Sequence, residues 1–88
     1  MNKVNNSSIQ SEEVRVSEFG LVAALVTSGY GIRRTEQQGR LVFFIFENTS
    51  ALQSNMSEYW AGMLKVYARQ YSDNTKMLKS MIYSGGNE

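Results

Sequence analysis

The pattern of hydrophobic and polar residues changes several times along the chain, and each change marks an element. Residues 13–16 alternate polar and apolar side chains, which is typical of a short, half-exposed strand at a sheet edge. Residues 19–28 repeat apolar side chains every three or four positions and predict an amphipathic helix that ends at Gly29. We expect Ser17 to cap this helix with its hydroxyl, while Gly20 is unfavourable inside it.

A hairpin is predicted next. Residues 32–37 form a weak strand, Gln38-Gly39 is a turn signal, and residues 40–47 are the strongest strand of the chain. Both faces of that strand are apolar, with Leu41, Phe43 and Ile45 on one and Val42, Phe44 and Phe46 on the other. We therefore expect it to lie between two helical layers, the first helix on one side and the last two on the other, or to be covered by a partner protein.

A second helix is predicted from Ser50, because Ser50-Ala51-Leu52-Gln53 reads as a capping box. Its core side is expected to carry Leu52, Met56, Tyr59, Trp60 and Met63. Trp60 is interpreted as a core residue here, and its use as a ligand platform is the alternative. Gly62 is the predicted end, with residues 63–65 as a connector, although one long helix through this region is the alternative.

The last predicted helix, residues 66–84, separates its cations from its apolar side chains. On a helical wheel the basic residues fall within about 80° of one another; they are Lys65, Arg69, Lys76 and Lys79. The opposite side holds Tyr67, Tyr71, Leu78, Met81 and Ile82, which we expect to be buried. Tyr83 falls within the basic arc.

These elements predict an α+β domain with a small antiparallel sheet, made of the short edge strand and the hairpin, and three helices. The predicted order is β-α-β-β-α-α. Residues 1–12 are rich in Asn and Ser and predict a flexible polar arm. Residues 13–84 then form a single domain, and residues 85–88 a flexible tail.

Composition removes most catalytic chemistry. The 88 residues include no Cys and no His, which excludes a thiol nucleophile, an imidazole base, a Cys/His zinc site and a Ser-His-Asp triad. We therefore predict a non-enzymatic protein with no catalytic residues, no cofactor and no metal. The lack of Cys points to a reducing interior such as the cytoplasm. No apolar run approaches the roughly 20 residues of a membrane-spanning helix.

Charge suggests one candidate site. The net charge is only +1, so nucleic-acid binding would need local segregation of charge. Residues 1–58 hold five cations and six anions, whereas residues 59–84 hold four cations and one anion. The candidate nucleic-acid-binding residues are Arg33, Arg34, Arg40, Lys65, Arg69, Lys76, Lys79 and Tyr83. Each cation could neutralise one phosphate and Tyr83 could stack on a base; the alternative is an ordinary solvated helix face.

The chain also resembles a family of small bacterial domains of unknown function over residues 14–84. The resemblance is carried by Phe19 with Ala23-Ala24-Leu25 and Gly29, by Phe44-x-Phe46-Glu47, by Leu52 with Tyr59-Trp60, and by Leu78-Lys79 with Ile82-Tyr83. It implies an α+β domain of bacterial or phage origin, often near mobile elements, and supplies no catalytic residues.

The sequence leaves two hypotheses for the function. The first is an accessory module that contacts nucleic acid or another polyanion. The second is a protein-interaction module that forms a homodimer or acts as an adaptor or inhibitor of a larger bacterial or phage protein.

Overall fold

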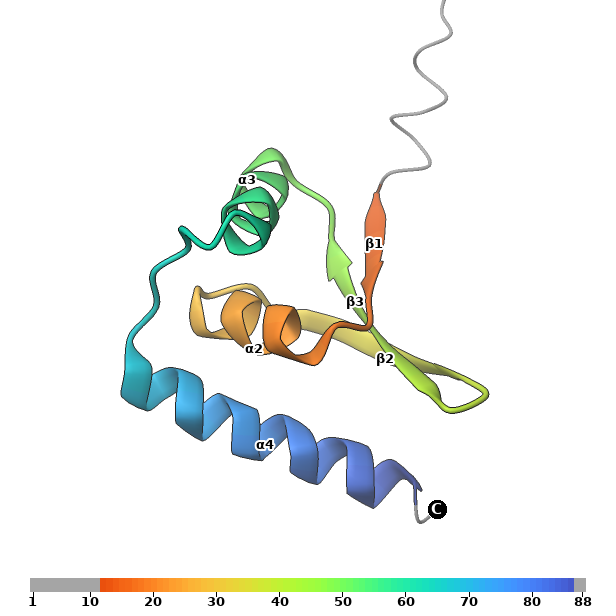
Figure 1. Cartoon of the computed structure of the whole chain (residues 1–88). Helices are drawn as coiled ribbons and strands as arrows, with labels where there is room; N and C mark the ends of the chain where they lie inside the picture. Colours follow the sequence, from red (N-terminus) through yellow and green to blue (C-terminus); the bar gives the residue numbers. More distant parts are fainter. Residues whose placement is uncertain (1–11, 87–88) are drawn as a thin grey trace, which may run out of the picture.

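The computed structural model describes residues 12–86 and has the predicted order of elements (Figure 1). The strands are β1 (Glu13–Val16), β2 (Ile32–Gln38) and β3 (Leu41–Glu47), and the helices are α2 (Phe19–Thr27), α3 (Ser50–Trp60) and α4 (Ala68–Gly86). The α+β fold with order β-α-β-β-α-α is therefore confirmed. The arm predicted for residues 1–12 lies outside the described residues up to position 11. Of the tail predicted for residues 85–88, positions 85–86 belong to α4 and 87–88 lie outside.

The most apolar strand is the central one. The sheet order is β1-β3-β2, and both pairings are antiparallel. The β2–β3 turn consists of Gly39 and Arg40, one residue later than predicted. The shift puts Gly39, with φ 62°, at the first turn position, where a positive φ is needed and a side chain would be strained.

Helix α2 is buried on all sides instead of being amphipathic. Five successive residues, 21–25, are buried, because α2 packs against the sheet and both α3 and α4 pack against α2 (Figure 1). The helices thus contribute to one core on one face of the sheet. That core includes Phe44 and Phe46 of β3, Leu52 of α3 and Leu78 of α4.

The other face of β3 has a cover that the sequence did not predict. Ile45 points away from the helical core, yet its exposed fraction is 0%. Its cross-strand neighbours are Arg15 on β1 and Arg34 on β2, so their long side chains share its face. The Arg15 guanidinium also lies 4.1 Å from the centre of the Phe43 ring. The expectation of helices on both faces is wrong, since charged side chains of the outer strands bury Ile45.

Both helix caps lie one residue away from their predicted positions. The Glu18 carboxylate, not Ser17, caps α2 by accepting a hydrogen bond of 2.6 Å from the Leu21 amide. At α3 the Thr49 hydroxyl accepts from the Leu52 amide at 3.1 Å. The capping residue lies just before the helix and bonds to an amide two or three residues further on. Thr49 therefore caps α3, and Ser50 is its first helical residue.

The predicted break between the last two helices is confirmed, and the single long helix is wrong. Gly62 has φ 75°, and residues 63–67 connect α3 to α4. Two core predictions fail here, because Trp60 is 64% exposed and Met63 is also exposed. Trp60 lies about 80° from Leu52 around the α3 axis, at the edge of the buried side, and Met63 follows the helix end.

Within residues 12–86 no helix combines the length and the hydropathy that crossing a bilayer requires.

Candidate nucleic-acid interface

The rotation of α4 about its axis is fixed by its contacts with α2 and the core. Leu78 is fully buried, and Tyr71 and Ile82 pack against the core. Asn74 Nδ2 donates a hydrogen bond of 3.0 Å to Thr27 Oγ1 at the end of α2. These contacts hold one side of α4 inward, so the opposite side faces solvent.

Two residues predicted to be buried with this stripe are exposed instead. Tyr67 is 77% exposed, because α4 begins at Ala68 and Tyr67 lies in the connector before it. Met81 lies on the flank of the helix, about 60° from Leu78, and is also partly exposed. The predicted inward set is therefore right for Tyr71, Leu78 and Ile82 and wrong for these two residues.

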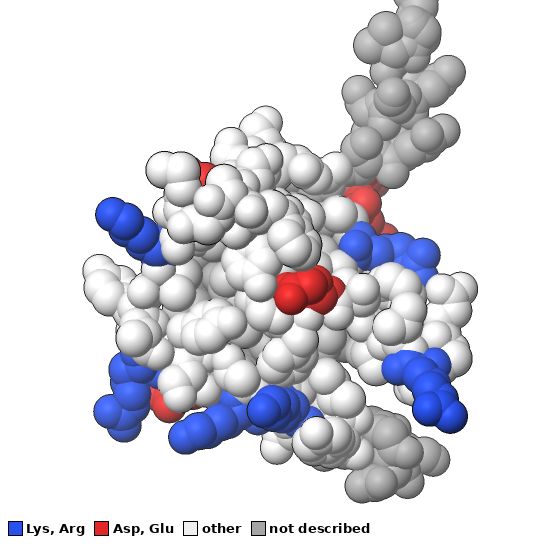
Figure 2. All heavy atoms as spheres, viewed as in Figure 1, with Lys and Arg blue, Asp and Glu red and all other residues white. Residues whose placement is uncertain are grey.

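The outward side of α4 carries the basic face. We use this name for Arg69, Lys76, Lys79 and Tyr83, which fall within about 80° of one another around the helix axis and lie away from Leu78. All four are exposed. In Figure 2, Lys and Arg atoms follow α4 along the lower edge of the molecule. Sequence reasoning therefore located this group correctly as a surface feature of one helix.

The basic face has little internal neutralisation. Asp73 is the single acidic residue of α4, and its Oδ2 lies 3.7 Å from Arg69 Nε. Both side chains are mostly exposed, so a pair at this distance is weak. Lys76 and Lys79 form no ion pair within residues 12–86. Their charges are available to an anionic ligand.

Arg33 and Arg34 lie elsewhere and are already paired. The β2–β3 register shifts between Ile32 and Arg34, so Arg33 is an extra residue in β2. As a result both arginines reach Glu13 on β1: Arg33 Nη1 and Arg34 Nη1 each donate to Glu13 Oε2 at 2.9 Å. Arg34 Nη2 also donates to Glu36 Oε2 at 3.0 Å.

The ion pairs of this group shift its titration. Hydrogen bonds from Arg34 and then Arg33 lower the pKa of Glu13 from 4.5 to about 2, and the same bonds raise the pKa of Arg34. The carboxylates of Glu13 and Glu36 thus neutralise the charges of the two arginines on the face of the sheet that the helices do not cover. The prediction that they extend the helix surface is not supported by their positions.

Lys65 and Arg40 also stand apart from the basic face. Lys65 lies in the connector before α4, not on the helix. Arg40 is exposed in the turn between β2 and β3, and the Lys and Arg atoms over the hairpin are separate from those along α4 (Figure 2). Of the predicted site residues, the structure therefore brings together Arg69, Lys76, Lys79 and Tyr83.

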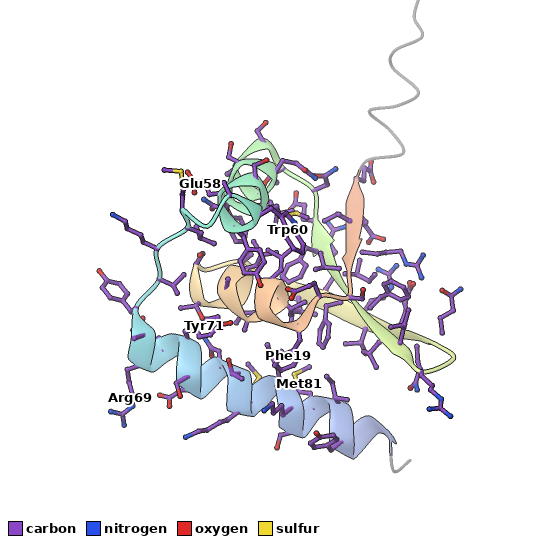
Figure 3. The ribbon with its side chains drawn as sticks, in the orientation of Figure 1. Phe19, Glu58, Trp60, Arg69, Tyr71 and Met81 are labelled. Carbon is purple, nitrogen blue, oxygen red and sulfur yellow. The ribbon has the colours of Figure 1, made fainter. Side chains whose placement is uncertain are left out.

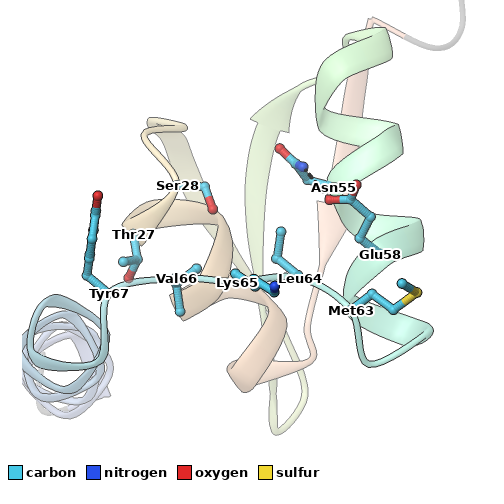
Figure 4. Close-up of a pocket in the computed structure, with 9 residues that line it drawn as sticks. All are labelled: Thr27, Ser28, Asn55, Glu58, Met63, Leu64, Lys65, Val66 and Tyr67. Carbon is cyan, nitrogen blue, oxygen red and sulfur yellow. Dashed lines mark hydrogen bonds between the residues drawn. The ribbon is translucent and has the colours of Figure 1, made fainter.

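An open groove of about 690 Å³ lies on the surface of the domain (Figure 4). It lies between the end of α2, helix α3 and the connector, and its charged side chains are Glu58 and Lys65. Asn55 accepts a hydrogen bond of 2.7 Å from the Tyr30 hydroxyl and donates one of 2.9 Å to Glu58 Oε1. The polar groups of Asn55 thus hold α3 to the loop after α2.

No group of acidic, His or Cys side chains within the described range could hold a metal ion.

Two features of the structure were not predicted from the sequence. One is the contact of Tyr59 with Glu18 beside Gly20, which the glycine inside a helix could have signalled. The other is a small cavity beside Tyr83, which no pattern in the sequence indicates.

Comparison with known proteins gives a family but no activity. No curated protein and no solved structure matches the chain. A family model described as "Domain of unknown function (DUF5659)" matches residues 11–84, a range that runs from just before β1 to near the end of α4. This confirms the resemblance to an uncharacterised domain family. Since the match spans well over half of the chain, the protein belongs to the family of the domain of unknown function DUF5659.

Proposed function

We propose that this protein is a non-enzymatic accessory module whose basic face contacts the phosphate backbone of a nucleic acid. The observation that carries the proposal is the exposure of Arg69, Lys76 and Lys79, with Tyr83, on the side of α4 opposite its buried stripe. A cytoplasmic location and a bacterial or phage origin belong to the same proposal, from the lack of Cys and from the family resemblance.

Local charge, not total charge, would drive the binding. The net charge of +1 gives little long-range attraction to a polyanion. On α4, however, three cations face one acid, Asp73, and each cation can displace a counterion from one phosphate. Lys65, in the connector, can add a fourth contact near the start of the helix.

The two predicted arginines of β2 contribute less in this proposal. Arg33 and Arg34 are held by Glu13 and Glu36, so contact with phosphate would require breaking these ion pairs. Arg40 is exposed but lies in the hairpin turn. We therefore restrict the proposed site to the basic face with Lys65.

The salt dependence of binding tests the proposal. Binding of labelled double-stranded DNA, and of a single strand of equal length, would be measured by fluorescence anisotropy at several salt concentrations. Three to four phosphate contacts give a slope of about −3 to −4 for log K against log salt concentration. Lys76→Ala with Lys79→Ala should weaken binding and reduce the size of the slope by about 2.

A matched control removes the same charge elsewhere. Arg33→Ala with Arg40→Ala also deletes two cations, but on the sheet and hairpin. This variant should bind nearly as well as the native chain. Equal losses in the two double variants would contradict a site on α4. Absence of salt-dependent binding of both the single strand and the duplex by the native chain would exclude the function.

A second candidate function is protein interaction, as a homodimer or as an adaptor or inhibitor of a larger bacterial or phage protein. It is favoured by the exposed apolar side chains of Trp60, Met63 and Tyr67 around the connector. The outer edges of β1 and β2 are also free of strand partners within residues 12–86, and such edges can pair with another chain. Sedimentation over a wide range of concentrations tests self-association. A monomer throughout that recovers no partner in a pull-down would exclude this candidate.

A further inference from the structure

A small cavity lies at the end of the basic face, where the first turn of α2 approaches the last turns of α4. Its volume is about 230 Å³, and it is lined by Phe19, Lys79, Ile82 and Tyr83. Phe19 points from α2 toward α4 near Met81 (Figure 3). We call this cavity the Tyr83 slot.

The walls of the Tyr83 slot suit a flat, aromatic ligand. Phe19 and Ile82 pack against the core and therefore provide fixed apolar walls. Tyr83 is 68% exposed, so its ring offers a face that the fold leaves uncovered. An aromatic side chain of this exposure is a natural surface on which a base can stack.

The charged residue of the slot indicates which flat ligand fits. Lys79 lines the slot, and Lys76 lies one turn earlier on the same side of α4, about 4.5 Å along the axis. An apolar slot beside a row of cations matches a nucleotide, whose base is flat and whose phosphates are anionic. A purely apolar partner would leave the lysines unpaired, and a simple polyanion would leave the slot empty.

We propose that the Tyr83 slot binds an unstacked nucleobase and that the ligand of the basic face is therefore a single-stranded nucleic acid. This inference rests on the proposed function and names its ligand class. The base enters between Phe19, Ile82 and the Tyr83 ring, while Lys79 and Lys76 contact the phosphates that flank it. A base within a duplex cannot enter, because it is already stacked and paired.

Three probes of equal length separate base recognition from charge: an oligothymidylate, an abasic deoxyribose-phosphate strand, and a duplex. The native chain should bind oligothymidylate about tenfold more tightly than the abasic strand. Tyr83→Leu should remove that advantage, because it weakens the binding of oligothymidylate much more than that of the abasic strand. Lys79→Ala should weaken binding of all three probes.

Tyr67→Leu is the matched control, because Tyr67 is also a highly exposed tyrosine but does not line the slot. This variant should keep the preference for oligothymidylate. Circular dichroism would verify that each variant is folded before binding is compared.

The outcomes distinguish the slot from the basic face. Equal binding of the abasic strand and oligothymidylate, both falling with salt, would overturn the slot and leave the basic face standing. Loss of the base preference in Tyr67→Leu, or its survival in Tyr83→Leu, would also overturn the slot. Absence of binding to all three probes would remove the proposed function and the slot together.

Discussion

The hydroxyl of Tyr59 on α3 donates a hydrogen bond of 2.9 Å to Glu18 Oε1, the same oxygen that caps α2. One carboxylate therefore fixes the start of one helix and attaches a second helix to it. The contact lies beside Gly20, where a Cβ atom would be 2.5 Å from the Tyr59 hydroxyl oxygen. Glycine is favoured at this position because a side chain would displace the Tyr59 hydroxyl, and not because of its backbone conformation.

Replacement of this glycine should destabilise the protein although alanine is the better helix former. Intrinsic propensity alone would make Gly20→Ala stabilising by about 1 kcal/mol. We expect instead a loss of about 1–2 kcal/mol, because the new methyl group displaces the Tyr59 hydroxyl from Glu18. Urea unfolding followed by circular dichroism measures the difference.

A double variant provides the control for Gly20. Tyr59→Phe removes the oxygen that the methyl group would meet, so Gly20→Ala should be neutral or stabilising in that background. Gly29→Ala should be destabilising in both backgrounds, because Gly29 has φ 107°, where a side chain strains the backbone. No atom lies within 4 Å of the added Cβ, so Tyr59→Phe cannot relieve that strain. A stabilising effect of Gly20→Ala in the native chain would contradict the contact.

Stability should fall at high pH through Tyr59. Burial first, and then the hydrogen bond to Glu18, raise the pKa of Tyr59 from 10.0 to about 12. A raised pKa means that the fold favours the neutral phenol. The stabilisation is therefore complete below about pH 10 and is lost as the pH approaches 12. Urea midpoints at pH 8 and pH 11 should differ less for Tyr59→Phe than for the native chain.

Tyr67→Phe is the control for this pH effect, since it removes a hydroxyl from a side chain that is 77% exposed. It should keep the native dependence on pH. An identical dependence in Tyr59→Phe and the native chain would show that the Tyr59 hydroxyl is not held as described.

The sequence predicted the order of elements because each element has its own periodicity. Residues 13–16 alternate, residues 40–47 are a β-branched and aromatic run, and the helices repeat every three or four residues. The buried stripe of α4 was predictable for the same reason. Tyr67 was misplaced because helix periodicity was extended across the connector, where the chain is not helical.

Features that depend on contacts between elements were not predictable. Ser17 is a better cap than Glu18 by residue type, but Glu18 is held by Tyr59 from a helix 41 residues away in the sequence. Similarly, the bulge at Arg33 determines that two successive arginines reach Glu13, and nothing in the local sequence indicates a bulge. Because both arginines form ion pairs with Glu13, they do not belong to the candidate site on α4.

The ion pairs of Glu13 should make the fold sensitive to acid. The pKa of Glu13 is lowered from 4.5 to about 2 by hydrogen bonds from Arg34 and Arg33. A lowered pKa means that the fold favours the carboxylate, so this stabilisation is present above about pH 4.5 and is lost as the pH falls toward 2. Glu13→Gln should lower stability at pH 7 and flatten its dependence between pH 5 and pH 2.

Glu47→Gln is the matched control for Glu13. Glu47 is the cross-strand neighbour of Glu13, and it forms no ion pair within the described part of the chain. This variant should retain the acid sensitivity of the native chain, as measured by thermal unfolding from pH 2 to pH 7. Equal slopes for Glu13→Gln and the native chain would contradict the role of the ion pairs.

Arg34 lies over Ile45 and also forms ion pairs, so its contribution to stability can come from the length or from the charge of its side chain. Surface ion pairs contribute about 0–1 kcal/mol, whereas the aliphatic part of an arginine that lies over an apolar residue keeps water from it. Because Ile45 is 0% exposed beneath Arg15 and Arg34, we expect length to matter more. Arg34→Met should therefore cost less than Arg34→Ala, although both remove the bonds to Glu13 and Glu36.

The two variants should differ in stability and in self-association. Arg34→Ala uncovers Ile45 and should lose about 1–2 kcal/mol on urea unfolding, and the newly exposed apolar surface should promote association in sedimentation experiments. Arg34→Met keeps a long side chain over Ile45 and should remain monomeric at the same concentration if the native chain does. The native chain should also lose little stability in 1 M salt, because screening weakens the ion pairs but leaves the cover in place. Equal destabilisation of both variants, with a matching loss in salt, would instead assign the stability of this face to its charges.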